Sequence, residues 1–266
     1  TSICNQLASE RIKKVLKFLE QNKSTYTGPF SKLQKEVHIA KYEAYENSKY
    51  LKTLEDLFNQ LTDPTVSLPD VADLFIPIMH TILLIWNYSE HYNTPSRLVV
   101  LIREICNAII IKCCSEINGF QIFDFIRGED IGVAHSTLST CIDVCYKFKD
   151  AYFDYKSQSK NQWKITTNAL FVRLDSFLER CQDIQHFTST IMQFNQIQKI
   201  EIGNTKGKTL TASVMAILEE FVKSQNEFMD VKYDIMDIEC RQFDDDFYKF
   251  RQRIKELERR LASCLT

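Results

Sequence analysis

Apolar residues recur at helical spacing along nearly the whole chain. Between Ser9 and about Asn22 an apolar residue returns every third or fourth position beside a lysine-rich face, and the same spacing continues from about Phe30 to Leu61. This spacing gathers apolar side chains on one face of an α-helix. For the longer of these two predicted helices, the expected inner residues are Leu33, Val37, Tyr42, Tyr45, Leu51, Leu54, Leu57 and Phe58.

Two strongly apolar stretches follow, at about Val71–Tyr92 and about Pro95–Asn118. Polar or charged residues and a proline interrupt them, and neither reaches about 18 uninterrupted apolar residues, so they are predicted to be an antiparallel pair of buried helices rather than membrane spans. Pro77 lies inside the first stretch, where we expect a kink or a place in the first turn. The residues expected at the helix ends are Asp70 and Thr94 as N-caps, Pro95 at the first helical position and Gly119 at the C-terminal end.

The second half of the chain contains the most regular apolar seams. Their spacings alternate between three and four residues, the repeat of helices that pack lengthwise, and helices of this length reach roughly 40 to 50 Å. The predicted helices and seams are about Ile131–Lys156 with Leu138, Cys141, Cys145, Phe148, Tyr152 and Tyr155; Ile165 to about Ile197 with Leu170, Leu174, Phe177, Cys181, Ile184 and Ile191; Leu210–Met229 with Val214, Ile217, Leu218, Phe221 and Phe228; and a last helix with Phe243, Phe247, Phe250, Ile254, Leu257, Leu261 and Cys264. The sequence therefore predicts an all-α fold, an elongated stack of antiparallel helical bundles with long coiled-coil-like helices.

Composition agrees with this expectation and narrows the function classes. The chain has 266 residues, of which only 6 are Gly and 5 are Pro, so turns are few and elements long. Its 33 Lys and Arg balance 35 Asp and Glu, so no overall field favours nucleic acid or an anionic membrane. The 9 cysteines have no regular spacing, and their odd number favours a reducing compartment.

A glycine-rich stretch, Gly203 to Thr209, raises the question of nucleotide binding. It follows a short apolar run and precedes a helical pattern, as a phosphate-binding P-loop would, and Lys208 and Thr209 would then bind the nucleotide. A P-loop needs four residues between its two glycines, whereas Gly203 and Gly207 have three between them. We therefore interpret the stretch as a connector between helices.

Other candidate sites also have simpler explanations. Cys141 and Cys145, even with Cys113, Cys114 or His135, lack the knuckle spacing of a zinc site and lie on an apolar seam, where a thiol packs as a small hydrophobe. The run Asp244-Asp245-Asp246 suits the first turn of a helix better than a cation site. His80 lies in a predicted core helix, and the cluster Lys199, Lys206 and Lys208 is too small for a nucleic-acid surface. No catalytic, cofactor-binding or metal-ligating residue is predicted.

Four long blocks, in one order, resemble the N-terminal tail region of dynein heavy chains, and look closer to the axonemal, outer-arm type than to the cytoplasmic one. They cover most of the chain from about residue 70 onward. Residues 1–65 are expected to form N-terminal helices without an assignment, and residues 66–266 the helical-bundle region of the tail. Because the chain begins at Thr1 and ends within a charged helical pattern, we expect a fragment of a longer chain. The blocks are HYNTPSRLVVLIREICNAII from His91, FVRLDSFLERCQDI from Phe171, QIQKIEIGNTKGKTL from Gln196 and YDIMDIECRQFDDDFYKFRQRIKELERRLASCL from Tyr233.

The resemblance implies a non-catalytic part of a microtubule motor. In that family the ATPase ring and the microtubule-binding tip lie C-terminal of the tail, so ATP and Mg are expected in the motor region of the full-length chain and no cofactor in this segment. The implied partners are dynein intermediate and light chains, other heavy chains and, through the assembled complex, the doublet microtubule or docking proteins. No nucleic acid and no membrane are expected as partners. The implied location is the cytoplasm and cytoskeleton, in the ciliary or flagellar axoneme.

Two alternatives stay open from the residues alone. The first is a generic helical adaptor unrelated to motors, which would use the same phenylalanine-rich seams as docking grooves. The second, more remote, is a nucleotide-binding protein that uses Gly203–Thr209.

Overall fold

The computed structural model describes residues 2–119, 122–128, 130–159, 163–165, 167–198 and 205–265. Within these ranges the regular structure is entirely helical, which confirms the all-α prediction; the coiled-coil geometry of the long helices stays a prediction. The helices are α1 (Ser2–Leu7), α2 (Glu10–Gln21), α3 (Thr27–Thr62), α4 (Leu68–Asp73), α5 (Phe75–Tyr88), α6 (Pro95–Glu116), α7 (Ile122–Arg127), α8 (Ile131–Gln158), α9 (Thr167–Leu170), α10 (Val172–Gln198), α11 (Thr205–Met229) and α12 (Arg241–Leu265).

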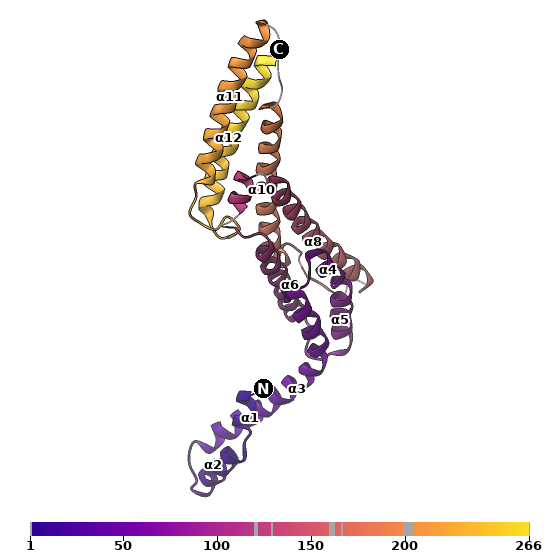
Figure 1. The fold of residues 1–266 in the computed structure, drawn as a ribbon. Helices are drawn as coiled ribbons and strands as arrows, with labels where there is room; N and C mark the ends of the chain where they lie inside the picture. The colour runs from indigo at the N-terminus through magenta and orange to yellow at the C-terminus, as the bar shows by residue number, and fades with distance from the viewer. Residues whose placement is uncertain are drawn as a thin grey trace.

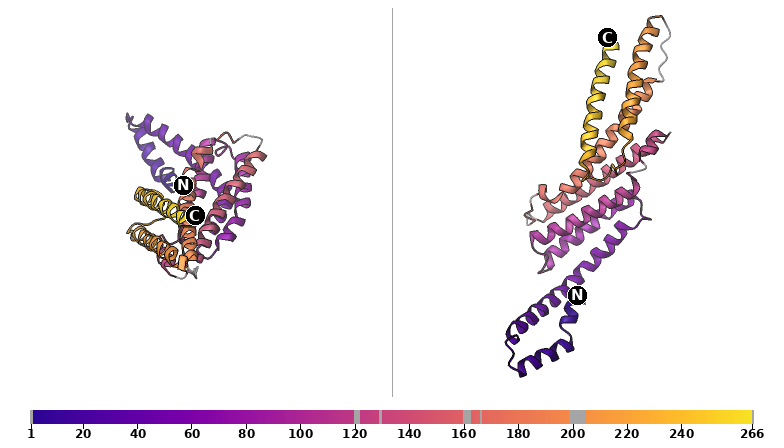
Figure 2. Two further views of the ribbon diagram at one scale, coloured as in Figure 1. Left: turned by 90° about the horizontal axis from the view of Figure 1, so that it is seen from above. Right: turned by 90° about the vertical axis from the view of Figure 1, so that its left-hand side faces the viewer.

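The molecule is elongated, with three regions in line (Figures 1 and 2). At one end α1 and α2 lie beside the first part of α3; in the middle α4, α5, α6 and α8 pack together; at the other end the hairpin of α11 and α12 lies against α10. Helix α10 runs from the middle region into the hairpin region, so it joins the two. The domain division at residues 65 and 66 stays a prediction.

Contacts along the helices define their directions. Residues 149 and 139 of α8 face residues 175 and 185 of α10, through the Lys149–Asp175 ion pair (2.7 Å) and the Gln185–Ser139 hydrogen bond (2.6 Å), so these helices are antiparallel. Helices α11 and α12 are antiparallel as well, because Glu220 pairs with Arg260 at 2.6 Å and Glu227 with Arg253. In contrast, α3 and α6 run parallel, with α4 and α5 between them along the chain.

The apolar seam between α8 and α10 is the centre of the hydrophobic core. All the seam residues predicted for α8 and α10 are buried, and Leu138, Phe148 and Phe177 have 0% exposure. The rings of Phe148 and Phe75 meet edge to face, 5.2 Å between centroids, so the seam also holds α5 in place. The periodicity therefore predicted the buried faces. The predicted helix from Ile165 to about Ile197 is instead two helices, α9 and α10, which are separated at Phe171.

The predicted helix Val71–Tyr92 is instead two helices, α4 and α5, that meet at Leu74. Pro77 stands at the third position of α5, so its first-turn placement is confirmed. Its ring has no N–H and would clash with the carbonyl four residues earlier in a continuous helix, which explains the break. The prediction of Asp70 as N-cap was wrong: Ser67 is the N-cap of α4, its hydroxyl accepts from the Asp70 N–H at 3.4 Å, and it donates to the Asp70 carboxylate at 2.6 Å.

The stretch Leu68–Tyr88 is long and apolar enough to cross a membrane, by length and composition alone, with a mean hydropathy of 1.7. It is the single such stretch among the described helices. Of its apolar window 39% is buried, and Ile78 and Met79, with 0% exposure, lie in the core cluster.

Gly119 does not cap α6, contrary to the prediction. Helix α6 ends at Glu116 with Ile117 as its C-cap, and Gly119 has no positive φ. A Cβ atom added at Gly119 would lie 1.7 Å from Oδ1 of Asp234, in the segment between α11 and α12. A side chain at this position would therefore require the Asp234 carboxyl group, which occupies that space, to move. At the other end of α6, Pro95 is at the start and Thr94 is the N-cap residue, both as predicted, although the Thr94 side chain makes no capping hydrogen bond.

The prediction for the inner face of α3 was correct only in part. Val37 and Leu54 are buried, but Leu33, Tyr42 and Tyr45 are exposed, at 47%, 62% and 59%. The physical reason is that only the later part of α3 meets α5 and α6, while the short α1 and α2 cover little of its first part. Helices α1 and α7 were not predicted because six residues show too little periodicity.

Substitution of Gly119 by Ala should lower the free energy of unfolding by about 1–3 kcal/mol, because the added methyl group requires Asp234 and its turn to move. Urea denaturation followed by circular dichroism measures the change. Gly132→Ala is the matched control, since a Cβ there has nothing within 4 Å, and its stability should stay equal or rise slightly. Equal stability of wild type and Gly119→Ala would contradict this account.

Candidate functional site

A buried arginine, Arg180 on α10, anchors the segment between α11 and α12. Its side chain is 4% exposed and donates to the carbonyl oxygens of Ile235 (2.7 Å), Asp237 (2.8 Å) and Cys240 (3.3 Å). It also pairs with the Asp244 carboxylate at 3.2 Å. A buried cation is stable only with this degree of pairing. The guanidinium group thus fixes the connection of the hairpin to α10.

Aromatic rings complete the joint between α10 and the hairpin. The Arg180 guanidinium carbon lies 3.9 Å from the Phe243 ring centroid, a cation–π contact. Phe187 on α10 contacts Phe228 of α11 and Phe250 of α12, with centroids 5.0 and 4.9 Å apart. Since aromatic pairs of this kind add about 0.5–1.5 kcal/mol each beyond burial, the hairpin is held firmly on α10.

The turn that follows Asp230 is ordered by its own side chains. The Asp234 carboxylate accepts from the Met236 N–H at 2.9 Å, and the Tyr233 hydroxyl donates to Asp246 at 3.1 Å. Burial, together with the hydrogen bond to Asp246, raises the pKa of Tyr233 well above its ordinary value, so this tyrosine stays a donor. An open cleft of about 740 Å³ lies beside the turn and has a mixed lining, which includes Glu227, Lys232 and Arg253.

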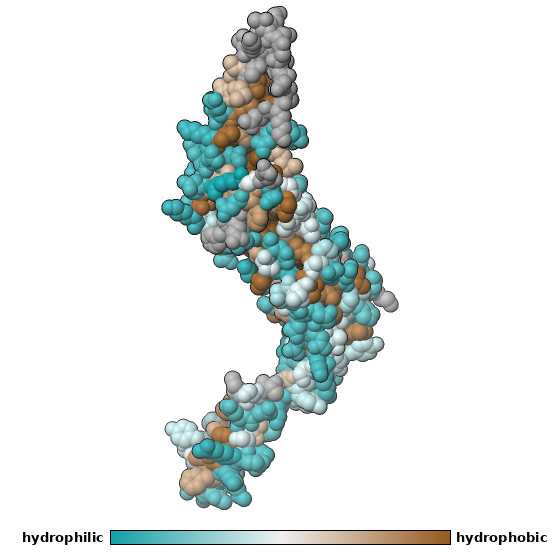
Figure 3. Space-filling model, in the orientation of Figure 1, coloured by the Kyte–Doolittle hydropathy of each residue, from teal (hydrophilic) through white to brown (hydrophobic). Residues whose placement is uncertain are grey.

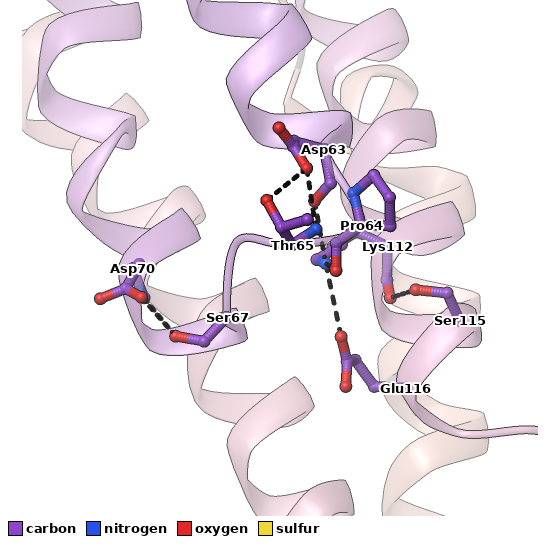
Figure 4. A network of polar contacts seen from close by, with 8 residues as sticks. All are labelled: Asp63, Pro64, Thr65, Ser67, Asp70, Lys112, Ser115 and Glu116. Atoms are coloured by element: carbon purple, nitrogen blue, oxygen red, sulfur yellow. Dashed lines mark hydrogen bonds and ion pairs between the residues drawn. The ribbon is translucent and has the colours of Figure 1, made fainter.

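A second buried cation, Lys112 on α6, holds the end of α3 (Figure 4). Its side chain is 3% exposed, and Nζ donates to the carbonyl oxygens of Asp63 (3.1 Å) and Pro64 (3.4 Å) and pairs with Glu116 at 3.4 Å. The Asp63 carboxylate accepts from the Thr65 hydroxyl and N–H at 2.7 and 2.8 Å, and these bonds lower its pKa. Lys112 therefore ties the turn before α4 to α6.

An apolar groove lies between the later part of α3 and the first half of α6. It has a volume of about 340 Å³ and is lined by Leu51, Leu54, Glu55, Phe58, Leu101, Glu104 and Ile105. Apart from the two glutamates the lining is hydrophobic. A groove of this composition suits an apolar side chain of another helix better than a polar small molecule.

The stretch that raised the question of a P-loop lies partly outside the described residues. Gly203, Asn204 and the preceding Lys199 belong to that part. Residues 205–209 form the first turns of α11, so this helix begins five residues before the predicted start at Leu210. Lys208 and Thr209 thus have helical backbone rather than the loop conformation expected for a connector.

The structure brings Cys113, Cys141 and Cys145 together inside the core. All three have 0% exposure. Hydrogen bonds with Cys141 and Cys145, and then burial, raise the pKa of Cys113 well above its ordinary value, which keeps the thiol protonated. His135 is not part of the cluster, because its Nδ1 lies 2.9 Å from the Thr188 hydroxyl. Among the described residues no group of three or more His, Cys, Asp or Glu is arranged to hold a metal ion.

The other predicted candidates lie apart from one another. Asp244 pairs with Arg180, whereas Asp246 binds Tyr233 and pairs with Lys249 at 3.5 Å, so these carboxylates point in different directions. His80 is on α5 as expected but on its exposed side. The burial and the structural role of Arg180 and Lys112 were not predicted from the sequence. The available signal was a single cation within or beside an apolar run, which does not distinguish a buried cation from an exposed one.

Together these features define an elongated protein whose described regular structure is helical, and in which the buried cations Arg180 and Lys112 hold turns to neighbouring helices. Hydrophilic residues cover much of the face drawn in Figure 3. All of residues 1–266 match the family described as Dynein heavy chain, N-terminal region 1. The chain belongs to this family and is part of the N-terminal tail region of a dynein heavy chain.

Individual relatives are axonemal dyneins. The chain is 44% identical over 272 residues to Dynein beta chain, flagellar outer arm, of Chlamydomonas reinhardtii. It is 31% identical to Dynein beta chain, ciliary, of Tripneustes gratilla and 30% identical to Dynein axonemal heavy chain 17 of Mus musculus. These alignments cover 98–99% of this chain but 6% of each relative's length, so the chain spans a small part of a heavy chain.

Substitution of Arg180 by Met should cost about 3 kcal/mol of unfolding free energy, because it leaves three carbonyl oxygens and the Asp244 carboxylate without their donor. In the Arg180→Met variant, hydrogen–deuterium exchange of residues 230–240 should be faster than in wild type. The increase should be larger there than in α8. Arg259→Met is the control, since that arginine is 71% exposed and pairs with Glu256 in the same helix, so its loss should be almost neutral. Equal exchange in the two variants would show that Arg180 does not anchor the turn.

Proposed function

We propose that this chain is a non-catalytic segment of an axonemal dynein tail, a helical scaffold for assembly rather than for chemistry. Its partners are dynein intermediate and light chains and other heavy chains, and through the complex it anchors the motor in the ciliary or flagellar axoneme. ATP and Mg belong to the motor region of the full-length chain. The doublet microtubule or docking proteins are reached only through the assembled complex.

The observation that supports the proposal most is the family match over all 266 residues. The geometry agrees with a scaffold. The regular apolar seams of α8 and α10 are used inside the fold, and the buried cations make structural contacts with backbone carbonyls rather than with an open site. Partners would meet the outer faces, where buried area and charge complementarity set specificity.

A helical adaptor unrelated to motors no longer explains the chain, since the family match ties it to dynein heavy chains. Nucleotide binding through Gly203–Thr209 is the second candidate, and its support is the helical start of α11 at Thr205, because P-loops also lead into a helix. The short glycine spacing argues against it.

A nucleotide titration separates these two functions. Fluorescent ATP with Mg²⁺ should show no saturable binding to the purified chain, and Lys208→Ala should give the same flat curve as wild type. Saturable binding that Lys208→Ala abolishes would overturn the scaffold proposal in favour of a nucleotide site.

Deletion of the segment that corresponds to residues 1–266 from a full-length axonemal heavy chain tests the assembly role. The deleted chain should recover less intermediate chain or neighbouring heavy chain from ciliary extract, while its ATPase activity should stay intact because the motor region is untouched. A full-length heavy chain with Lys147→Ala is the control for losses during expression and purification, because Lys147 is an exposed residue on α8. Full recovery of every subunit by the deleted chain would contradict the proposal.

A further inference from the structure

The stretch Thr94-Pro95-Ser96-Arg97 combines a hydroxyl group, a proline and a cation in a pattern that one class of enzyme selects. Thr94 is the one Ser or Thr of the chain that precedes a proline, because the other four prolines follow Gly28, Asp63, Leu68 and Ile76. A threonine followed by proline, any residue and then a basic residue is the pattern that cyclin-dependent protein kinases accept. Proline also biases the residue before it towards extended backbone, the form in which a kinase binds its acceptor.

The structure leaves the Thr94 hydroxyl accessible to such an enzyme. Thr94 has extended backbone, with φ −135° and ψ 137°, and lies in the segment between α5 and α6. The four residues 93–96 are all exposed. The Thr94 hydroxyl makes no capping hydrogen bond, and its neighbour is the Ser96 hydroxyl at 3.5 Å. A kinase that also reads Arg97 has to open the first turn of α6, where the N–H groups have no helical partner to lose.

Arg97 is placed to respond to a phosphate on Thr94. It is the third residue of α6, a position from which a side chain reaches back to the residue before the helix. In the unmodified chain Arg97 pairs with Glu43 of α3 at 2.5 Å, and Nδ1 of His91 lies 3.9 Å from the same carboxylate. The hydrogen bond from Arg97 lowers the pKa of Glu43, so this carboxylate is charged at neutral pH.

The pair of Glu43 and Arg97 ties α3 to the middle region at an early point of α3. The next polar contacts along α3 are the Tyr50 hydroxyl, which donates to the Tyr88 carbonyl oxygen at 3.3 Å, and Lys112 on the Asp63 carbonyl oxygen at 3.1 Å. Within the described residues, no ion pair or hydrogen bond joins an earlier residue of α3 to the middle region. The first part of α3, which carries α1 and α2 (Figure 1), is therefore held to α6 through Glu43.

We propose that Thr94 is the phosphorylation site of a proline-directed protein kinase, and that the phosphate draws Arg97 away from Glu43 and so loosens α3 from α6. The inference goes beyond the proposed assembly function and does not depend on it.

The reaction takes its phosphoryl group from ATP, which the kinase binds. Oγ1 of Thr94 forms a bond to the γ-phosphorus, the bond from that phosphorus to the bridging oxygen breaks, and ADP leaves. The hydroxyl proton passes to the catalytic carboxylate of the kinase. The product carries a charge of about −1.5 to −2 at pH 7 and three acceptor oxygens. It therefore competes with the single negative charge of Glu43 for the Arg97 guanidinium group.

Phosphorylation of the folded chain by a purified cyclin-dependent kinase with its cyclin, ATP and Mg²⁺ tests the site. Mass spectrometry should show one added phosphate, located on Thr94 by peptide fragmentation. Thr94→Ala and Pro95→Ala should each reduce the modification at least about tenfold, whereas Ser96→Ala is the matched control and should be modified like wild type. No phosphate on the folded wild type, or equal modification of Thr94→Ala, would overturn the proposal and leave the assembly function in place.

Hydrogen–deuterium exchange tests the effect on α3. In the phosphorylated chain, residues 39–47 should exchange about two- to fivefold faster than in the unmodified chain, the range expected for the loss of one partly exposed ion pair. Residues 54–61 should be unchanged. Glu43→Gln should give the same increase without phosphate, and phosphorylation of that variant should add nothing in α3. Unchanged exchange of residues 39–47 in fully phosphorylated wild type would contradict the release of Arg97 from Glu43.

Discussion

The antiparallel packing of α8 on α10 is the interaction on which the rest of the structure depends. Its seam contains thiols and aromatic rings with 0% exposure, such as Cys141 and Phe177, and α4, α5, α6, α7 and α11 each contact at least one of these two helices. Helices α4, α5 and α7 pack on α8, while α10 continues towards the hairpin of α11 and α12. A chain with few glycines and prolines can extend in this way because each helix buries one face against its neighbour.

The buried cations Arg180 and Lys112 supply hydrogen bonds that the apolar seams cannot. Apolar seams position the helices, but the carbonyl oxygens of the turns between helices have no partner within a helix. When such oxygens are buried, they need a hydrogen-bond donor from elsewhere. Arg180 supplies donors to the turn before α12, and Lys112 supplies them to the turn before α4. Both contacts connect residues far apart in the sequence, so they fix how the regions join. This arrangement favours a scaffold, in which the placement of outer faces matters more than any one site.

Much of the fold could be predicted from the sequence where periodicity was long. The seams of α8, α10 and α12 extend over several turns, and their residues are buried as predicted apart from the last two of α12, Leu261 and Cys264, which are half-buried. Predictions failed where tertiary contacts determine whether a residue is buried. Tyr42 has the right spacing for an inner face, but no helix lies opposite it. Gly119 has the right position for a cap, but its role comes from Asp234, which lies more than a hundred residues later. The groove between α3 and α6 could not be predicted, because it depends on a parallel pair of helices that are not adjacent in the chain.

The central claim is that this chain is a scaffold whose outer helix faces are covered by other subunits. An electron cryomicroscopy structure of the assembled axonemal dynein complex tests it most directly. The account predicts that α8 and α10 stay packed as here, that other subunits cover outer faces of the chain, and that no nucleotide lies at Gly203–Thr209. Outer faces that are fully open to solvent in the assembled complex, or a nucleotide bound at that stretch, would contradict it.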